Sequence, residues 1–193
     1  MTTLEAEISR LGIDQYYQYA IDYDPVKVYE NFSTRHNFLL QYSFAMPDVN
    51  SIRKIVDFID ADVLSVGAGK GLWEHLITLE LKNRQKEYVV RAIDHKKYDD
   101  VYYQVELLDI NELEEKYPIL FLSWPHCNNM DSLALSKNNP VKVIYIGEKY
   151  GGCTGSDEFH CKLQQDYKKV EKVRIKCWMG THDRVVLYRK KFS

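Results

Sequence analysis

The chain has 193 residues, a formal net charge of −2 and 45% hydrophobic residues, a composition typical of a globular domain and unlike that of disordered or fibrous chains. No apolar run approaches the roughly 20 residues that span a membrane, and the first residues are acidic rather than basic, so we expect no membrane partner and no secretion signal. Four cysteines without a C-x-x-C pair indicate reduced thiols and a cytoplasmic protein.

A zinc site is the alternative use of these cysteines. It would draw its ligands from seven residues: Cys127, Cys153, Cys161, Cys177, His126, His160 and His182. Zinc sites normally show pairs of ligands at short, regular spacing. These residues are scattered, so we predict no metal site.

The charge is distributed unevenly along the chain. Residues 1–62 contain 5 basic and 10 acidic residues, whereas residues 162–193 contain 10 basic and 3 acidic residues. A basic C-terminal region can bind phosphates, which makes a nucleic acid a candidate partner. The simpler interpretation is a solvated face that carries Lys168, Lys169, Lys172, Arg189, Lys190 and Lys191. The oligomeric state is not legible from the sequence.

The first 50 residues predict a helical extension that precedes a main domain of residues 51–193. Leu4, Ile8 and Leu11 have helical spacing, and a second short helix is expected at residues 26–32. Residues 38–46 are apolar and aromatic, and Pro47 ends this run.

From residue 51 onward, helical and strand patterns alternate. Apolar or alternating runs predict strands at 63–66, 88–93, 101–108, 119–122, 141–146, 173–178 and 185–188. Helices are expected at 52–59, 72–79, 112–115 and 157–167, with Thr154 and Asp157 forming a capping box for the last. This order predicts an α/β, Rossmann-like three-layer sandwich, whose seven-stranded, mostly parallel sheet ends in an antiparallel hairpin.

The first strand runs into a glycine-rich turn and then into a helix. Gly67, Gly69 and Gly71 allow sharp turns and let a ligand lie against the backbone. A P-loop would need a hydroxyl residue after Gly69-Lys70, where this chain has Gly71. The dinucleotide fingerprint needs glycine at the sixth position, which is Leu72 here. The turn fits neither motif. The alternative to a ligand-binding turn is a glycine turn that only reverses the chain.

The G-x-G-x-G pattern resembles motif I of the class I S-adenosylmethionine (SAM) methyltransferases. The resemblance extends from about residue 62 to residue 190 and includes the terminal hairpin, which the typical dinucleotide fold lacks. It implies SAM as the cofactor and the same Rossmann-like fold. Eight residues are implied in holding the cofactor: Gly67, Ala68, Gly69, Gly71, Asp94, His95, Asp109 and Ile110.

Two aspartates carry most of this cofactor assignment. Asp94 lies 23 residues beyond Gly71, close to the interval of about 20 residues at which an acid binds ribose hydroxyls. It could instead start the turn of residues 94–97. The resemblance implies that Asp109 and Ile110 meet the adenine, but Asp109 could equally cap the helix expected at 112–115.

The loop after the fourth strand is a loose relative of motif IV. Amine-methylating members of the family have Asp, Asn or Ser there, then two prolines and an aromatic residue. This chain keeps the serine and one proline, and the resemblance implies a catalytic acceptor site of Ser123, Trp124, Pro125, His126 and Glu148. Candidate bases are His126, Glu148 and His182.

Elements before the first strand often cover the mouth of the site in this family. Tyr42, Phe44 and Met46 are therefore candidates for a lid over cofactor or substrate. The equally good alternative is ordinary core beneath a helical extension.

One departure from the family pattern affects the functional prediction. Many members have an acid two residues before the first glycine, where this chain has Ser65. The favoured function is a SAM-dependent methyltransferase whose acceptor is a nucleic acid or a nucleotide base. A catalytically inactive binding or partner subunit of the same fold is the first alternative. A nicotinamide-dependent dehydrogenase is the second, and Leu72 and the terminal hairpin disfavour it.

Overall fold

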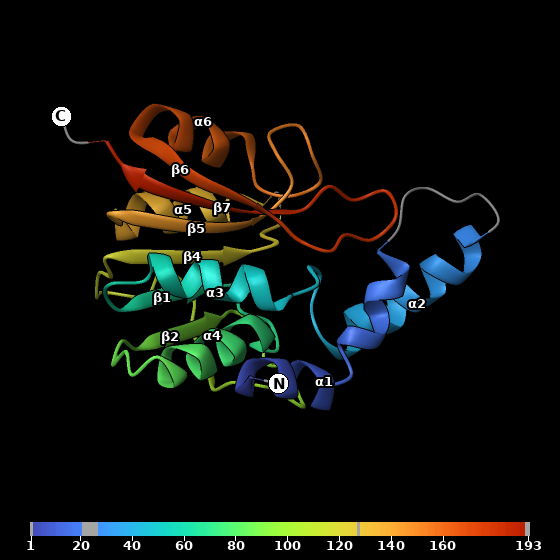
Figure 1. The fold of residues 1–193 in the computed structure, drawn as a ribbon. Coiled ribbons are helices and arrows are strands. Elements are labelled where there is room, and N and C mark those ends of the chain that lie inside the picture. Colours follow the sequence, from blue (N-terminus) through green and yellow to red (C-terminus); the bar gives the residue numbers. More distant parts are fainter. Residues whose placement is uncertain (1, 21–26, 127, 192–193) are drawn as a thin grey trace.

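A central seven-stranded sheet organises the computed structural model, which describes residues 2–20, 27–126 and 128–191 (Figure 1). Its strand order is β3-β2-β1-β4-β5-β7-β6. The strands are β1 (Val63–Val66), β2 (Val90–Asp94), β3 (Val105–Leu107), β4 (Ile119–Ser123), β5 (Lys142–Gly147), β6 (Tyr167–Arg174) and β7 (Arg184–Lys190). Strands β1 to β5 pair in parallel, whereas β7 is antiparallel to both β5 and β6. The predicted mostly parallel sheet with a terminal antiparallel hairpin is confirmed.

Helices cover both faces of this sheet and complete three layers. One face carries α3 (Val49–Phe58) and α4 (Leu72–Asn83), and the other carries α5 (Met130–Asn138) and α6 (Asp157–Asp166). The side chains of β4 show how the two cores arise, because alternate residues of a strand point to opposite faces. Ile119 and Phe121 belong to the core beneath α3 and α4, while Leu120 and Leu122 belong to the core beneath α5 and α6.

The N-terminal segment packs into the core beneath α3 and α4. It consists of α1 (Thr3–Arg10), the short 3₁₀ helix η1 (Asp14–Tyr19) and α2 (Val28–Gln41), which extends beyond the carboxyl ends of the strands (Figure 1). Residue 26, where the second helix was expected to begin, lies outside the described residues. The division of the chain at residue 50 stays a prediction.

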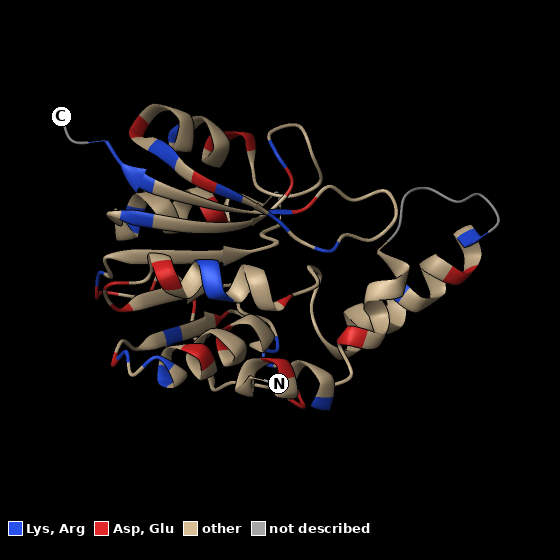
Figure 2. Cartoon of the chain, viewed as in Figure 1, with Lys and Arg blue, Asp and Glu red and all other residues tan. Residues whose placement is uncertain are grey.

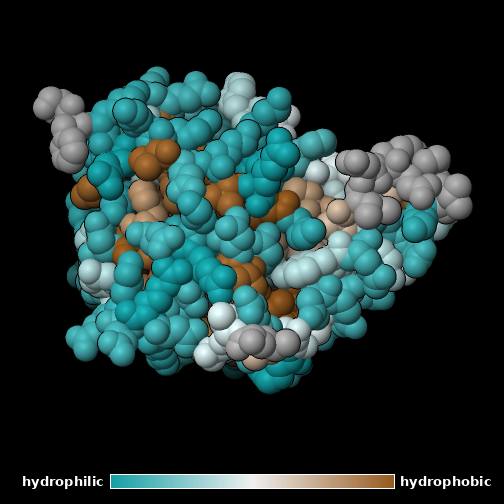
Figure 3. Space-filling model, in the orientation of Figure 1, coloured by the Kyte–Doolittle hydropathy of each residue, from teal (hydrophilic) through white to brown (hydrophobic). Residues whose placement is uncertain are grey.

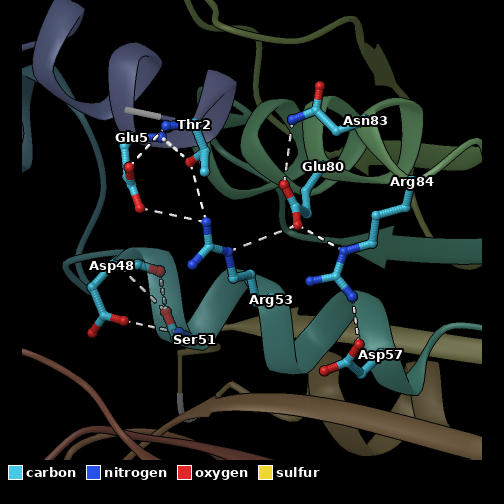
Figure 4. Close-up of polar contacts among 9 residues, drawn as sticks. All are labelled: Thr2, Glu5, Asp48, Ser51, Arg53, Asp57, Glu80, Asn83 and Arg84. Carbon is cyan, nitrogen blue, oxygen red and sulfur yellow. Dashed lines mark hydrogen bonds and ion pairs between the residues drawn. The ribbon is translucent and has the colours of Figure 1, made fainter.

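Polar contacts join α1, α3 and α4 at the surface (Figure 4). Arg53 of α3 donates to Thr2 Oγ1 at 3.1 Å and to Glu5 Oε1 at 3.4 Å. Its Nε lies 4.0 Å from Glu80 Oε1, which also accepts a 2.7 Å bond from Arg84 Nε. The pair of Arg53 with Glu5 is exposed and contributes little energy, whereas the Glu80 side chain that joins Arg53 to Arg84 is buried.

The surface seen in Figure 3 is mainly hydrophilic, with hydrophobic side chains in small, separate patches. None of the helices in the described ranges combines the length and the apolar character that crossing a membrane requires.

Four sequence predictions about local structure were wrong. The strand expected at 101–108 is confined to Val105–Leu107. Residues 112–115 form no helix, and the Asp109 carboxylate instead accepts the Asn111 N–H in a turn at 2.8 Å. Helix α6 is capped by Ser156, which accepts the Phe159 N–H at 3.2 Å, and not by Thr154. Strand β6 begins at Tyr167, inside the predicted helix, and ends at Arg174 rather than at residue 178. A register shift between Lys169 and Glu171 breaks the period-two alternation near the beginning of β6, so the pattern did not reveal the strand there. The strand ends at Arg174 because its pairing with β7 ends at that residue.

Candidate functional site

The glycine turn after β1 has the backbone conformation that its sequence predicts. Gly67, Gly69 and Gly71 have φ of +73°, +58° and +74°, values that glycine adopts readily and other residues rarely. A Cβ on Gly71 would lie 2.7 Å from Tyr103 Cβ, so this glycine is required for packing. A Cβ on Gly69 would meet no atom of the described residues within 4 Å, so the backbone there faces open space among them.

The carboxylate of Asp94, at the end of β2, joins this turn. Its Oδ2 accepts the Gly69 N–H at 2.9 Å, and its Oδ1 accepts the Lys96 N–H at 2.9 Å. Asp94 is 5% exposed, and His95 Nδ1 lies 3.4 Å from its Oδ1. The residue therefore starts the predicted turn and also touches the glycine loop. Each carboxylate oxygen has two lone pairs, so both can still accept a hydrogen bond from a ligand.

A cavity of about 170 Å³ brings five of the eight predicted cofactor residues together. These five are Gly67, Asp94, His95, Asp109 and Ile110. Ala68, Gly69 and Gly71 belong to the adjoining turn but do not line the cavity. Sequence reasoning missed four further lining residues: Val66, Leu108, Asn128 and Met130.

Met130 is the most consequential of the missed residues. Its Cε would lie 2.9 Å from a Cβ built on Gly67, so the side chain reaches the first glycine and narrows the cavity. It lies at the start of α5, and nothing in its local sequence signals this contact.

A buried carboxyl group lies beside Ser65 although position 65 itself is not acidic. Ser65 Oγ donates to Glu74 Oε1 at 2.5 Å, and Glu74 is 1% exposed in the first turn of α4. Burial raises the pKa of Glu74 to about 7, and the negative charge of Asp94 adds to this shift. A buried carboxyl group from the following helix therefore lies against position 65. Its signal in the sequence was the place of this acid beside the apolar residues Leu72 and Trp73 at the start of that helix.

The loop after β4 places an aromatic group at the same carboxyl edge of the sheet. Trp124 has a φ of +53°, and its ring stacks on Phe44 with centroids 4.9 Å apart and planes 11° apart. The edge of His126 meets Phe44 at 5.6 Å, and the Arg35 guanidinium lies 6.0 Å from the Trp124 ring. Pro125 is buried, Ser123 is half-buried and His126 is exposed.

Of the three candidate lid residues, Phe44 alone takes part in this group. The hydroxyl of Tyr42 donates to the Leu11 carbonyl oxygen, and both Tyr42 and Met46 are buried in the core. The core interpretation therefore holds for these two residues.

Asp183 is a second functional candidate that the sequence did not reveal. It is 1% exposed, and its Oδ1 accepts the Trp124 Nε1–H at 2.8 Å. Burial raises the pKa of Asp183 to about 6, and the indole hydrogen bond opposes that shift. This contact joins residues 59 positions apart, which no local pattern predicts.

Glu148 is held differently from the other candidate bases. Burial alone would raise its pKa, but the backbone N–H groups of Cys153 and His182 donate to its two oxygens at 2.7 and 2.8 Å. The net effect is a lowered pKa, so Glu148 is a stabilised anion and a weak base. It lines a separate cavity together with His182, away from the residues around Asp94.

Within the described ranges, no group of three or more His, Cys, Asp or Glu residues is arranged to hold a metal ion. Cys127, one of the ligands considered for zinc, lies outside those ranges.

Comparisons with known proteins identify the fold. No protein-family model matches the chain, and no curated protein is similar enough in sequence to be matched. Among solved structures, magnesium protoporphyrin IX methyltransferase from Synechocystis PCC 6803 with bound S-adenosylhomocysteine (SAH) is similar with a TM-score of 0.52 and 12% identity, over 96% of this chain and 97% of that chain. A candidate RNA methyltransferase, PH1948 from Pyrococcus horikoshii, has a TM-score of 0.52 and 13% identity, over 75% of this chain and 81% of that chain. The chain therefore has the fold of the class I SAM-dependent methyltransferases.

Proposed function

We propose that this chain is a SAM-dependent methyltransferase whose acceptor is a nucleic acid or a nucleotide base. The observation that carries the proposal is the joining of the glycine turn to Asp94 at one cavity, through the 2.9 Å bond from Gly69 N to Asp94 Oδ2. This cavity lies at the carboxyl ends of parallel strands, where open α/β sheets bind ligands. The structurally similar Synechocystis enzyme has been solved with SAM and with SAH.

The residues around this cavity fit the parts of the cofactor. The Asp94 carboxylate would accept hydrogen bonds from the ribose hydroxyls, and the open backbone at Gly69 would face the methionine portion. Ile110, which is buried, and the adjacent Asp109 would bind the adenine through an apolar contact and a polar one. When bound, SAM supplies a methyl group already activated by a sulfonium.

The protein's part in the transfer is then mainly to position the acceptor. Holding a nucleophile in line with the methyl group removes much of the entropic barrier. The stacked rings of Phe44 and Trp124 offer flat surfaces on which a base can pack, and Asp183 fixes the Trp124 indole. His126 is exposed beside them and is the candidate to remove a proton from the acceptor.

Transfer of a labelled methyl group tests this proposal. Purified protein would be incubated with methyl-labelled SAM and, in separate reactions, with RNA, DNA and denatured protein. We expect label in a nucleic-acid fraction, and we expect Trp124→Ala to reduce its incorporation. Label in protein alone would refute the proposed acceptor class.

A catalytically inactive binding subunit is the second candidate, and the size of the cavity favours it. Ligand pockets usually enclose about 300 to 1,000 Å³, whereas Met130 helps to limit this one to about 170 Å³. A protein that binds SAM but transfers no methyl group to any of the three acceptors would support this candidate. A Met130→Ala variant that gains transfer activity would show that the side chain obstructs an otherwise competent site.

A further inference from the structure

A second cavity, of about 470 Å³, lies between α6 and the outer strands β7 and β6. Gly147, Glu148 and His182 line the end of this cavity that is nearest to the carboxyl ends of the parallel strands. None of the residues around Asp94 contributes to it, so it is separate from the proposed cofactor site.

Four cations and one carboxylate line this second cavity. The cations are Lys149, Lys169, Lys172 and Arg184. Within residues 2–20, 27–126 and 128–191, none of them forms an ion pair with a carboxylate. The carboxylate is Glu148, and its two oxygens already accept backbone N–H groups. The cavity therefore has an excess of positive charge that suits an anionic ligand. Figure 2 shows that Lys and Arg recur along β6 and β7.

A β-bulge places two of these lysines side by side. Residues three apart on a regular strand point to opposite faces, but the register of β6 shifts between Lys169 and Glu171. As a result, Lys169 lies opposite Tyr188 and Lys172 lies opposite Val186 on β7. Glu171 points to the other face of the sheet, where it pairs with Lys54 of α3 at 2.8 Å. Bulges of this kind commonly redirect a side chain towards a site.

Aromatic rings line the same cavity. Tyr150 is 51% exposed, and its ring meets the edge of His160 at 5.9 Å. The hydroxyls of Tyr145 and Tyr167 are bonded to protein oxygens, so these residues contribute mainly ring surface. Tyr188 lies directly opposite Lys169. Cations interleaved with aromatic rings are the combination that binds phosphates and stacks bases in single-stranded nucleic acids.

We infer that this cavity binds one nucleotide unit, with the phosphate at Lys169 and Lys172 and the base against a tyrosine ring. The unit belongs to a single strand that continues towards the loop after β4. His182 lines the cavity, and the next residue, Asp183, holds Trp124. The link to methyl transfer rests on the proposed function, whereas the binding itself does not.

Fluorescence anisotropy with a labelled single-stranded RNA of about ten nucleotides tests the inference. The variant K169Q/K172Q removes both lysines without reversing their charge. We expect it to weaken binding about tenfold or more, and to make the slope of log affinity against log salt shallower by about 0.7 for each lysine. The matched control K82Q/K168Q removes two exposed lysines that do not line the cavity, and its binding should stay within about twofold of the parent.

Two further measurements complete the test. Tyr150→Ala should weaken RNA binding by about tenfold if a base stacks there. Free nucleoside monophosphates added as competitors show whether the ligand is a strand or a free nucleotide. If they displace the labelled RNA only at great excess, the cavity binds a strand. If they displace it at equal concentration, the cavity binds a free nucleotide. Equal loss of affinity in the lysine variant and its control, or no RNA and no nucleotide binding by the parent, would overturn the inference.

The cofactor proposal can fail independently of this one. SAM affinity of K169Q/K172Q should equal that of the parent protein, because these lysines do not line the cavity at Asp94. Lysine-dependent RNA binding without any SAM binding would leave the second cavity assigned and the proposed function refuted.

Discussion

The pairing of Ser65 with Glu74 joins β1 to α4 through a buried carboxyl group. Position 65 has a hydroxyl where many class I methyltransferases have an acid, but that hydroxyl donates to a carboxyl group of α4. Burial is the main reason why the pKa of Glu74 rises from 4.5 to about 7. The folded protein therefore keeps a proton on Glu74 at a pH at which the unfolded chain has lost it.

This proton makes stability depend on pH in a defined direction. Because the folded-state pKa is raised, the contribution of Glu74 is complete below about pH 4.5 and is lost as the pH rises to about 7. Glu74→Gln keeps an acceptor for Ser65 and cannot ionise. The variant should therefore be more stable than the parent at pH 8 by roughly 1 to 3 kcal/mol, and similar to it at pH 4.5.

Urea unfolding at both pH values would measure this difference. Asp183 also has a raised pKa, so it too makes the protein less stable as the pH rises. This contribution is the same in both proteins and cancels in the difference between their unfolding free energies. Glu87→Gln, an exposed change in the loop before β2, is the matched control. If the unfolding free energy of the parent protein and of the Glu74→Gln variant depended on pH in the same way, Glu74 would not be a buried, protonated carboxyl group.

At the scale of elements, the loop between β6 and β7 fixes the N-terminal segment in place. Trp178 is 1% exposed, and its ring packs edge-on against Phe38 of α2 at 5.3 Å and Tyr16 of η1 at 6.3 Å. Its indole N–H has no hydrogen-bond partner among the described residues, so within them the ring contributes by packing. The segment that carries Phe44 to the site thus depends on a contact with the opposite end of the chain.

Trp178→Ala should destabilise the protein by about 3 to 5 kcal/mol, because it leaves a large cavity in this core. Hydrogen exchange should accelerate most in α2 and η1. Trp178→Phe is the matched control, since it keeps a ring and removes the unpaired N–H, and it should cost much less. Faster exchange in α5 and α6, with α2 unchanged, would show that Trp178 does not hold the N-terminal segment.

Prediction of elements from the sequence succeeded where packing follows a regular period. The strand at 63–66 and the helix after Gly71 match the structure because each is an apolar run or stripe with a clear end. The register shift between Lys169 and Glu171 changes which face the neighbouring residues occupy, so alternation did not reveal the beginning of β6. The acidic segment 112–115 has no apolar stripe to pack, and it forms no helix.

At the scale of the whole molecule, topology explains how much of the site could be predicted. Gly67, Asp94 and Asp109 follow different parallel strands, and the carboxyl ends of such strands meet at one edge, so their grouping at one cavity was predictable. The contacts of Met130 with Gly67 and of Asp183 with Trp124 depend on side-chain packing between distant segments. No local pattern encodes such contacts, so they could not be predicted from the sequence.

Calorimetric titration shows whether the cavity beside the glycine turn binds SAM. The parent protein should bind both SAM and SAH with a dissociation constant in the micromolar range, and should not bind NAD. Asp94→Ala should weaken SAM binding by about tenfold or more, since it removes a charged acceptor of hydrogen bonds. Asp99→Ala, an exposed acid outside the cavity, should leave it unchanged. Absence of SAM and SAH binding by well-folded parent protein would refute a cofactor site in this cavity, and equal affinity of the Asp94→Ala variant would refute the role of Asp94.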